Sequence, residues 1–294
     1  MPELPDVTVY LEALETRVRG KRLERVRVLN PFLLRTADPP ISSIEDKTVT
    51  DLLRVGKRIV LELEGDLFLV VHLMIAGRLH WIDKGSEKRG RNVLALFEFE
   101  NGTLSLTEAG TKRRASVHVV RGDAGLKTLD PGGLDVMRVE LAQFAEQLKS
   151  ENHTLKRAIT NPHLFSGIGN AYSDEILHRA RLSPLAMTVN LSDEDTKRLY
   201  RATQQVMNEW IVRLREDAGT GFPEKVTAFR DAMAVHGKYG QPCPVCGAPV
   251  QRIVFAENEV NYCARCQTGG KILADRALSR LLKKSWPRSI DELE

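Results

Sequence analysis

The stretch CPVCGAPVQRIVFAENEVNYCARC spans residues 243–266 and contains all four cysteines of the chain. Sixteen residues, 247–262, separate its two Cys-x-x-Cys pairs. Two such pairs at this separation are typical of a structural zinc site with four thiolate ligands. Residues 250–255 and 260–262 have the pattern of two short strands around a turn. We therefore expect a β-hairpin that holds one structural Zn2+ through Cys243, Cys246, Cys263 and Cys266. A redox dithiol, or four unrelated buried thiols, is the alternative.

The composition indicates a globular protein with a mildly basic surface. A chain of 294 residues exceeds one average domain, so we expect two, and 42% hydrophobic residues are enough for a packed core. The net charge of +4 suits a polyanionic partner without establishing one. The N-terminus lacks the pattern of a secretory signal, and the longest apolar run, residues 67–74, is too short to span a bilayer. We expect a cytoplasmic protein without a membrane partner. In that reducing compartment, cysteines favour a metal site over disulfides.

The first part of the chain has the pattern of one helix followed by strands. Apolar residues recur at helical spacing over residues 6–20. Alternating apolar positions then predict strands around residues 23–28, 59–63 and 94–99. Residues 22–121 are therefore expected to form two packed sheets. We assign residues 1–125 to an N-terminal domain that consists of a helix and a β-sandwich.

Helices are expected beyond the linker-like sequence Pro131-Gly132-Gly133. Apolar spacing predicts helices over residues 139–149, 155–159 and 171–181, and a longer helix that Ser192 caps. The expected fold class is α+β, with the β-sandwich followed by a helical domain at residues 134–237. The zinc hairpin then occupies residues 238–267 and a basic extension residues 268–294.

The second residue offers a candidate nucleophile. Met1 precedes Pro2, and removal of the initiator methionine before a small residue would expose a secondary amine. An α-amine has a pKa of about 7.7–8.0, so part of it is neutral near pH 7. Its attack on an aldehyde-like carbon gives a charged iminium that promotes later eliminations, and Glu3 is placed to act as general acid. A proline at this position is otherwise only a processing feature.

Four motifs in this order resemble the formamidopyrimidine-DNA glycosylase/endonuclease VIII family. They are Pro2-Glu3-Leu4-Pro5, Gly56-Lys57-Arg58, Gly167-Ile168-Gly169-Asn170 and the four-cysteine hairpin, and the resemblance covers roughly residues 2–267. It implies a β-sandwich domain, a helix–two-turn–helix module and a zinc finger, with double-stranded DNA between the two halves. It further implies a monomeric, nucleoid-associated enzyme of bacterial base excision repair. Such an enzyme acts as DNA glycosylase and AP lyase on damaged bases and AP sites.

The resemblance also assigns roles to single residues. Pro2 matches the nucleophile that attacks the sugar C1′, and Glu3 matches the acid/base that opens and protonates the sugar. Lys57 matches a lysine that contacts a phosphate and assists elimination. Asn170 matches an asparagine that binds the phosphates beside the lesion, and exposed N–H groups at a helix start favour an anion. A solvated surface lysine and an ordinary helix cap are the alternatives for these last two.

Lesion reading is where the sequence departs from the family. By register, Ile75, or its neighbour Met74, is the wedge that fills the space of a flipped base, unless residues 72–77 form a buried strand. Arg113 and Arg114 match void-filling arginines, whereas Ala115 replaces the aromatic residue that usually follows. Asn258 stands where the zinc-finger tip normally carries an arginine, and we expect it among the DNA contacts. Asp6 replaces a typical glutamate.

Two further hypotheses remain beside the bifunctional enzyme. The altered void-filling and tip residues suit an AP-site lyase without base excision. A non-enzymatic binder of damaged DNA needs only the helical module and the zinc finger, not Pro2, Glu3 and Lys57. The extension 268–294 carries several lysines and arginines with a sparse apolar stripe, which fits either a DNA-contacting basic helix or a packing helix with a solvated face.

Overall fold

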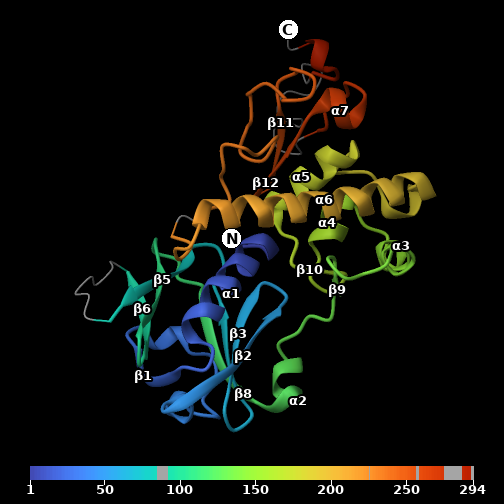
Figure 1. Cartoon of the computed structure of the whole chain (residues 1–294). Helices are drawn as coiled ribbons and strands as arrows, with labels where there is room; N and C mark the ends of the chain where they lie inside the picture. Colours follow the sequence, from blue (N-terminus) through green and yellow to red (C-terminus); the bar gives the residue numbers. More distant parts are fainter. Residues whose placement is uncertain (85–91, 225, 256–257, 275–286, 293–294) are drawn as a thin grey trace. The chain divides into compact units, whose positions relative to one another are not determined.

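The computed structural model describes residues 1–84, 92–224, 226–255, 258–274 and 287–292 (Figure 1). The chain divides into two compact units. The first comprises Met1–Pro131 with Trp210–Thr227, and the second comprises Gly132–Glu209 with Ala228–Glu294. No described helix combines the length and the apolar character that crossing a membrane requires. The domain boundaries expected from the sequence remain predictions.

Helix α1 (Leu4–Val18) begins two residues before the expected start at Asp6. The reason is Glu3, which is extended and caps the helix, and Pro5, whose fixed φ suits the first turn. The helix ends before Gly20, which adopts a left-handed φ of 71°. Its apolar face, with Val7, Tyr10 and Leu14 fully buried, packs on the core of the sheet. Full burial of such a side chain stabilises the fold by about 1.5–3 kcal/mol.

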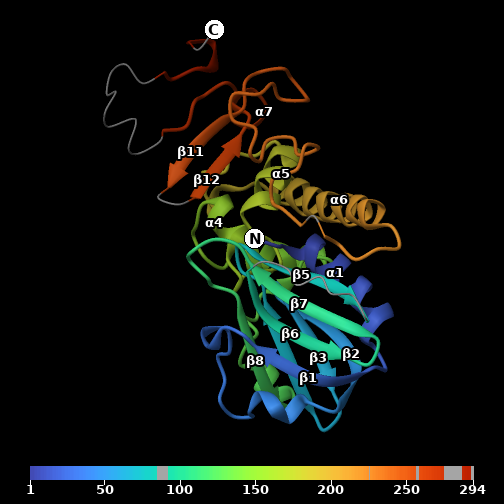
Figure 2. The same ribbon diagram turned by 90° about the vertical axis from the view of Figure 1, so that its left-hand side faces the viewer.

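Eight antiparallel strands follow α1 in the first unit (Figure 2). They are β1 (Arg22–Val28), β2 (Lys47–Val55), β3 (Arg58–Leu63), β4 (Leu67–His72), β5 (Gly77–Asp83), β6 (Val93–Phe99), β7 (Gly102–Glu108) and β8 (Ser116–Arg121). Their hydrogen-bonded order is β5-β7-β6-β1-β2-β3-β4-β8. Only two register pairs join β1 to β2, so the sheet divides into two halves of four strands.

The two halves enclose a common apolar core. Alternate residues such as Leu61 of β3, Leu69 of β4 and Phe97 of β6 point into it and are at most 1% exposed. The expected β-sandwich is thereby confirmed. A smaller apolar cluster around Phe68 and Val70 lies on the other face of β3 and β4. Residues of the short helix α2 (Gly122–Lys127) and of the turn after it pack against this cluster.

The second unit contains the expected helices. They are α3 (Leu141–Lys149), α4 (Leu155–Thr160), α5 (Asn170–Ala180) and α6 (Asp193–Ala218), whose last turns group with the first unit. Strands β9 (Leu134–Asp135) and β10 (Phe165–Ser166) pair in parallel before α5. Ser192 caps α6, because its Oγ accepts the Asp195 N–H at 3.1 Å. The sequence pattern is confirmed here because apolar stripes and caps are local features.

The C-terminal hairpin consists of β11 (Gln251–Phe255) and β12 (Asn258–Tyr262), followed by α7 (Ala264–Thr268). Most of the proposed basic helix, residues 275–286, lies outside the described residues. A β-bridge joins Lys271, before this segment, to Ser289, after it. The short 3-10 helix η5 (Ile290–Glu292) then buries Ile290 in the core of the hairpin. The described end of the extension is therefore a packing element.

Candidate active site and zinc centre

A capping box fixes the residues at the start of α1. The Glu3 backbone N–H donates to Asp6 Oδ2 at 2.9 Å, and the Glu3 side chain accepts the Asp6 backbone N–H in return. Both acids are buried, at 2% and 3% exposure, and Pro2 is buried beside them. The replacement of a typical glutamate by Asp6 is thus compatible with a fully formed cap. Glu3 is held in one orientation next to the chain start.

The first residues share one electrostatic environment. Burial lowers the pKa of the terminal ammonium of Met1, the negative charge of Glu3 opposes that shift, and Arg78 and Lys57 add to it. Burial also lowers the pKa of Lys57, again against the attraction of Glu3. A terminal amine, a buried carboxyl and a lysine therefore interact at one point, as an amine-dependent reaction requires. The amine of Pro2 itself becomes available after removal of Met1.

The turn between β4 and β5 presents Ile75 to solvent. Strand β4 ends at His72, Met74 has a left-handed φ of 52°, and Ile75 is 54% exposed. The turn needs Gly77, because a Cβ there would lie 2.3 Å from the Leu73 carbonyl oxygen. Arg78 steadies the turn from the side by donating to the carbonyls of Ile75 and Gly77, at 3.2 and 2.6 Å. Ile75 lies in a turn and not in a buried strand.

Glu108 organises the loop that carries the two predicted arginines. Its carboxylate is 1% exposed and accepts the backbone N–H groups of Arg114 and Ala115, each at 3.0 Å. Ala115 is buried at 3% exposure, whereas Arg113 and Arg114 are exposed. Ala115 therefore packs inside the domain and presents no side chain for filling a void in DNA.

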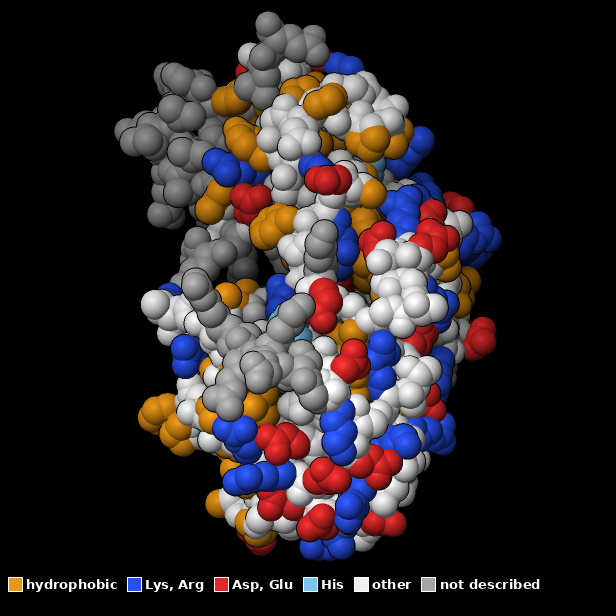
Figure 3. Space-filling model, turned by 60° about the vertical axis from the view of Figure 1, so that its left-hand side comes forward, with side chains coloured by type: hydrophobic (Ala, Val, Ile, Leu, Met, Phe, Trp, Pro, Cys, Tyr) orange, Lys and Arg blue, Asp and Glu red, His pale blue; other side chains and the backbone are white. Residues whose placement is uncertain are grey.

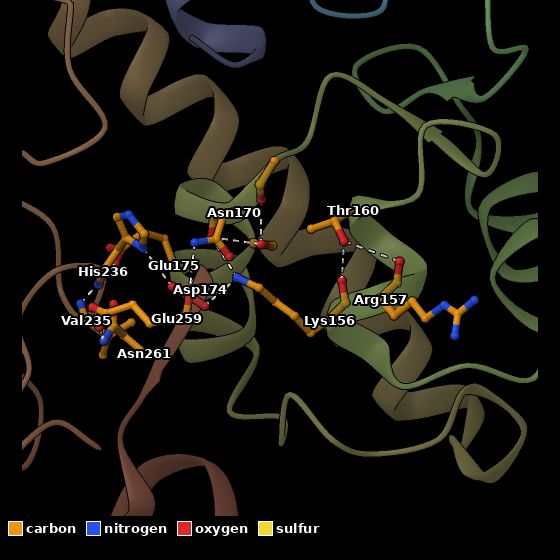
Figure 4. Close-up of polar contacts among 12 residues, drawn as sticks. Lys156, Arg157, Thr160, Asn170, Asp174, Glu175, Val235, His236, Glu259 and Asn261 are labelled. Carbon is orange, nitrogen blue, oxygen red and sulfur yellow. Dashed lines mark hydrogen bonds and ion pairs between the residues drawn. The ribbon is translucent and has the colours of Figure 1, made fainter. Parts of the chain in front are cut away.

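Asn170 begins α5 and connects it to the zinc hairpin (Figure 4). Its Nδ2 donates to the Glu259 carbonyl of β12 at 3.0 Å, and its own carbonyl accepts Lys156 Nζ at 2.7 Å. The side chain stays half-buried. Gly169 is the N-cap of α5, so Asn170 is the first helical residue and not the cap. Asn170 ties the start of α5 to a neighbouring helix and to the hairpin.

A buried charge network continues from Asn170 (Figure 4). Asp174 Oδ1 lies 2.5 Å from Lys156 Nζ, and its Oδ2 lies 2.7 Å from His236 Nδ1. All three residues are at most 8% exposed. The next residue, Glu175, accepts the three consecutive backbone N–H groups of residues 234–236 at 2.8–2.9 Å. Two acids on one turn of α5 thereby fix the segment that leads into the hairpin.

The four cysteines converge as predicted. Their sulfur atoms all lie within 4.8 Å of one another, with Cys243 Sγ 3.9 Å from Cys266 Sγ and Cys246 Sγ 3.4 Å from Cys263 Sγ. A tetrahedron of Zn–S bonds of about 2.3 Å places sulfurs roughly 3.8 Å apart, so the cluster fits Zn2+. Four thiolates fill the shell and leave no position for substrate. This is one structural zinc site.

The hairpin tip is described only in part. The Asn258 backbone pairs with Phe255 at the start of β12, but the Asn258 side chain lies outside the described residues. Sequence reasoning missed Arg78, Glu108 and the Lys156–Asp174–His236 network. No local pattern marks these residues, because their partners are distant in the chain or are backbone groups.

Comparisons with known proteins match this architecture along the chain. The family model for the formamidopyrimidine-DNA glycosylase N-terminal domain matches residues 1–116, that for its H2TH domain residues 132–220, and that for a zinc finger found in FPG and IleRS residues 240–269. The formamidopyrimidine-DNA glycosylase of Symbiobacterium thermophilum is 30% identical over 285 residues, which are 91% of this chain and 89% of that protein. The chain belongs to the formamidopyrimidine-DNA glycosylase family. The resemblance inferred from the four motifs is confirmed.

Other relatives of this family member extend the comparison. An uncharacterized formamidopyrimidine-DNA glycosylase-like protein of Mycobacterium tuberculosis is 41% identical over 157 residues, covering 53% of this chain and 96% of that protein. The crystal structure of the Fpg protein from Thermus thermophilus has 29% identity and a TM-score of 0.77, covering 90% of this chain and 98% of that one. The Fpg of Lactococcus lactis, in complex with DNA containing an abasic site, has a TM-score of 0.79 at 22% identity and covers 90% and 99%. That last likeness concerns the fold alone.

Proposed function

We propose that this family member is a bifunctional DNA glycosylase and AP lyase of base excision repair that uses Pro2 as its nucleophile. The observation that carries the proposal is the environment of Glu3, the buried N-cap of α1. Its carboxyl interacts electrostatically with both the chain-start amine and Lys57. A purely DNA-binding protein has no use for a carboxyl desolvated beside an amine. The substrate is double-stranded DNA with a damaged base or an AP site, and the protein acts as a monomer.

The proposed reaction proceeds by displacement and elimination. The neutral Pro2 nitrogen attacks C1′, the N-glycosidic bond breaks, and the departing base takes a proton from solvent or an acid. Glu3 protonates the ring oxygen, so that the sugar opens and leaves an iminium between Pro2 and C1′. The iminium acidifies C2′; loss of that proton expels the 3′ phosphate, with Lys57 near the departing charge. Water then hydrolyses the iminium and returns the amine.

The proposed DNA contacts come from residues of both units. Lys57 and Asn170 bind phosphates near the lesion, and the exposed Ile75 is the wedge that enters the stack when the damaged base leaves it. Arg113 and Arg114 contact the DNA beside the wedge from the loop that Glu108 organises. The Asn170 side-chain amide donates one hydrogen to the Glu259 carbonyl of the hairpin, and its second hydrogen can be donated to a phosphate oxygen.

The test is covalent trapping by borohydride on an AP-site duplex. We expect one adduct per chain, mapped by mass spectrometry to Pro2, with weaker trapping by Pro2→Gly and none when Met1 is retained. Glu3→Gln should lose base excision and keep DNA binding. Glu15→Gln, an exposed acid on the same helix, is the matched control and should behave as wild type. An adduct on a lysine would identify a different nucleophile.

One observation favours an AP-site lyase without base excision as the second candidate. Ala115 is buried where relatives are expected to carry an aromatic void filler, so base recognition lacks one support. Release of free base from a panel of oxidised and ring-opened lesions separates the two activities. Cleavage of AP sites without any base release would favour the lyase. Absence of both would leave only DNA binding.

We further propose that cleavage stops mainly after β-elimination. Expelling the second phosphate benefits from a cation, and the neutral Asn258 stands where the family carries an arginine. Wild-type protein should therefore leave a 3′-unsaturated aldehyde on the nicked strand, and Asn258→Arg should shift the product towards a 3′-phosphate. The two ends are separated by gel mobility. A predominant 3′-phosphate from wild-type protein contradicts this expectation.

A further inference from the structure

One face of α5 contacts the zinc hairpin and the segment that leads into it. Asn170, Asp174 and His178 follow one another at intervals of four residues, so they lie on the same side of the helix. The first two, labelled in Figure 4, bind the Glu259 carbonyl of β12 and the imidazole of His236. The third, His178, lies near the end of the helix and reaches one of the zinc ligands.

The contact that His178 makes is with a sulfur atom. Its Nε2 lies 3.3 Å from Cys243 Sγ, and the two residues are 6% and 2% exposed. They are 65 residues apart in the chain, so only the packing of α5 against the hairpin brings them together. Basic and acidic side chains are interspersed over the surface, as Figure 3 shows for one face, whereas His178 makes this polar contact inside the protein. A buried imidazole nitrogen that touches a sulfur atom is expected to share a hydrogen bond with it.

The metal decides the direction of this hydrogen bond. A cysteine bound to Zn2+ is a thiolate without a proton, so its sulfur can only accept. The imidazole of His178 must then donate the proton of Nε2, and the bond fixes which of its two nitrogens is protonated. A phenylalanine ring has a similar shape but no group that could donate. The donor, and not only the ring, is therefore the feature that distinguishes His178.

A second zinc ligand accepts a hydrogen bond from the backbone. Cys263 Sγ accepts the backbone N–H of Cys266, from within its own Cys-x-x-Cys pair, at 3.5 Å. Four thiolates around one Zn2+ leave the centre with a net negative charge, and each donated N–H offsets part of it. For Cys243 the donor is a side chain on a different element of the fold. It can therefore be changed by mutation while the backbone around the metal stays the same.

We propose that His178 is a positioning residue of the zinc centre: it donates a hydrogen bond from Nε2 to the Cys243 thiolate and thereby helps to retain the metal. Partners of this kind orient metal ligands, and their loss typically lowers metal affinity about 10–100-fold. The bond also joins the metal to α5, the helix that begins at Asn170. This role concerns metal retention and does not depend on the proposed catalysis.

The zinc affinity of single variants tests the proposal. Competition with a chromogenic chelator, without DNA, gives the affinity of the full chain. His178→Phe keeps a ring but removes the donor, so it should bind zinc about 10–100-fold more weakly than wild type. His178→Gln retains an N–H donor and should recover most of that loss. His163→Phe, at an exposed position of the same unit, is the matched control and should bind zinc as wild type does. Unchanged affinity in His178→Phe overturns the proposal, and so does an equal loss in both His178 variants.

A spectroscopic measurement on the unaltered protein keeps the proposal testable if the variants do not fold. Imidazole NMR signals show which ring nitrogen carries the proton. In the zinc-loaded protein we expect the His178 proton on Nε2, protected from exchange with solvent. When a spin-active cadmium isotope replaces zinc, that proton should show a coupling to the metal, transmitted through the Cys243 sulfur. An unprotonated Nε2 overturns the proposal, as does a protonated Nε2 without any coupling to the metal.

Discussion

The two units contain polar clusters of opposite kinds. In the helical unit, Lys156, Asp174 and His236 are almost fully buried, and each has a polar partner within 2.7 Å. In the β-sandwich unit, Arg58 and His72 are half-buried, and each has a polar atom without a partner among the described residues. The polar groups of the first cluster satisfy one another, whereas the second cluster keeps polar atoms without a partner among the described residues. The two clusters thus differ in how far the protein itself satisfies their buried polar groups.

Removal of the metal is expected to have the largest effect, and to destabilise the helical unit with its zinc hairpin more than the β-sandwich unit. Structural zinc contributes about 10–16 kcal/mol to the folding of isolated zinc fingers. Loss of the hairpin would also release the Glu259 carbonyl from Asn170 and Asn261 from the Gly237 N–H. After chelation, hydrogen exchange should accelerate in residues 251–262 and 234–237, with residues 58–72 still protected. Equal acceleration in both units would contradict the separation of the clusters.

Breaking the buried network should have the next largest effect. Asp174→Ala leaves Lys156 buried without its counter-charge, so we expect a loss of about 3–5 kcal/mol in the free energy of unfolding. Asp193→Ala breaks the exposed pair with Lys149 and should cost about 0–1 kcal/mol. Urea denaturation measures both variants. Similar values for the two would show that the network contributes little to the fold.

Acidification should destabilise the β-sandwich unit through His72. The pKa of His72 is about 4 in the folded protein and near 6.5 in the unfolded chain, so the unfolded chain binds more protons between these pH values. Stability therefore falls as the pH drops from 6.5 towards 4. His72→Gln should reduce this fall by about 1–2 kcal/mol, less than the full pKa difference, because the ring is partly exposed. Unfolding at pH 5 and 7.5 provides the comparison, and equal falls would exclude His72 as a cause.

The smallest effect on stability is expected from Arg58→Met. Replacing a poorly balanced, half-buried cation by an apolar side chain should leave the free energy of unfolding unchanged or raise it by up to about 1 kcal/mol. Arg25→Met, on an exposed strand position, controls for the loss of charge. A loss of about 2 kcal/mol or more would mean that Arg58 has a structural role.

Local patterns were sufficient for most elements and for the metal site. Alternation located strands such as β3, helical spacing located α6, and the Cys-x-x-Cys pairs identified the ligands of the zinc site. Apolar spacing places the start of α1 two residues late, because the capping box of Glu3 and Asp6 extends the helix beyond the apolar repeat. The short helix α2 was missed because its six residues, two of them glycines, carry too weak a periodicity to detect.

The sequence by itself determined the family, the fold class, the zinc ligands and the candidate nucleophile, because each depends on residues that are close in the chain or on motifs in a set order. Tertiary structure alone decided which charges meet. Arg58, His72 and His118 become neighbours through the register of three strands. Asp174 meets His236 across 62 residues. Periodicity specifies which face of an element a residue occupies, but the pairing of distant elements specifies its neighbours, and only neighbours determine whether a buried charge is satisfied.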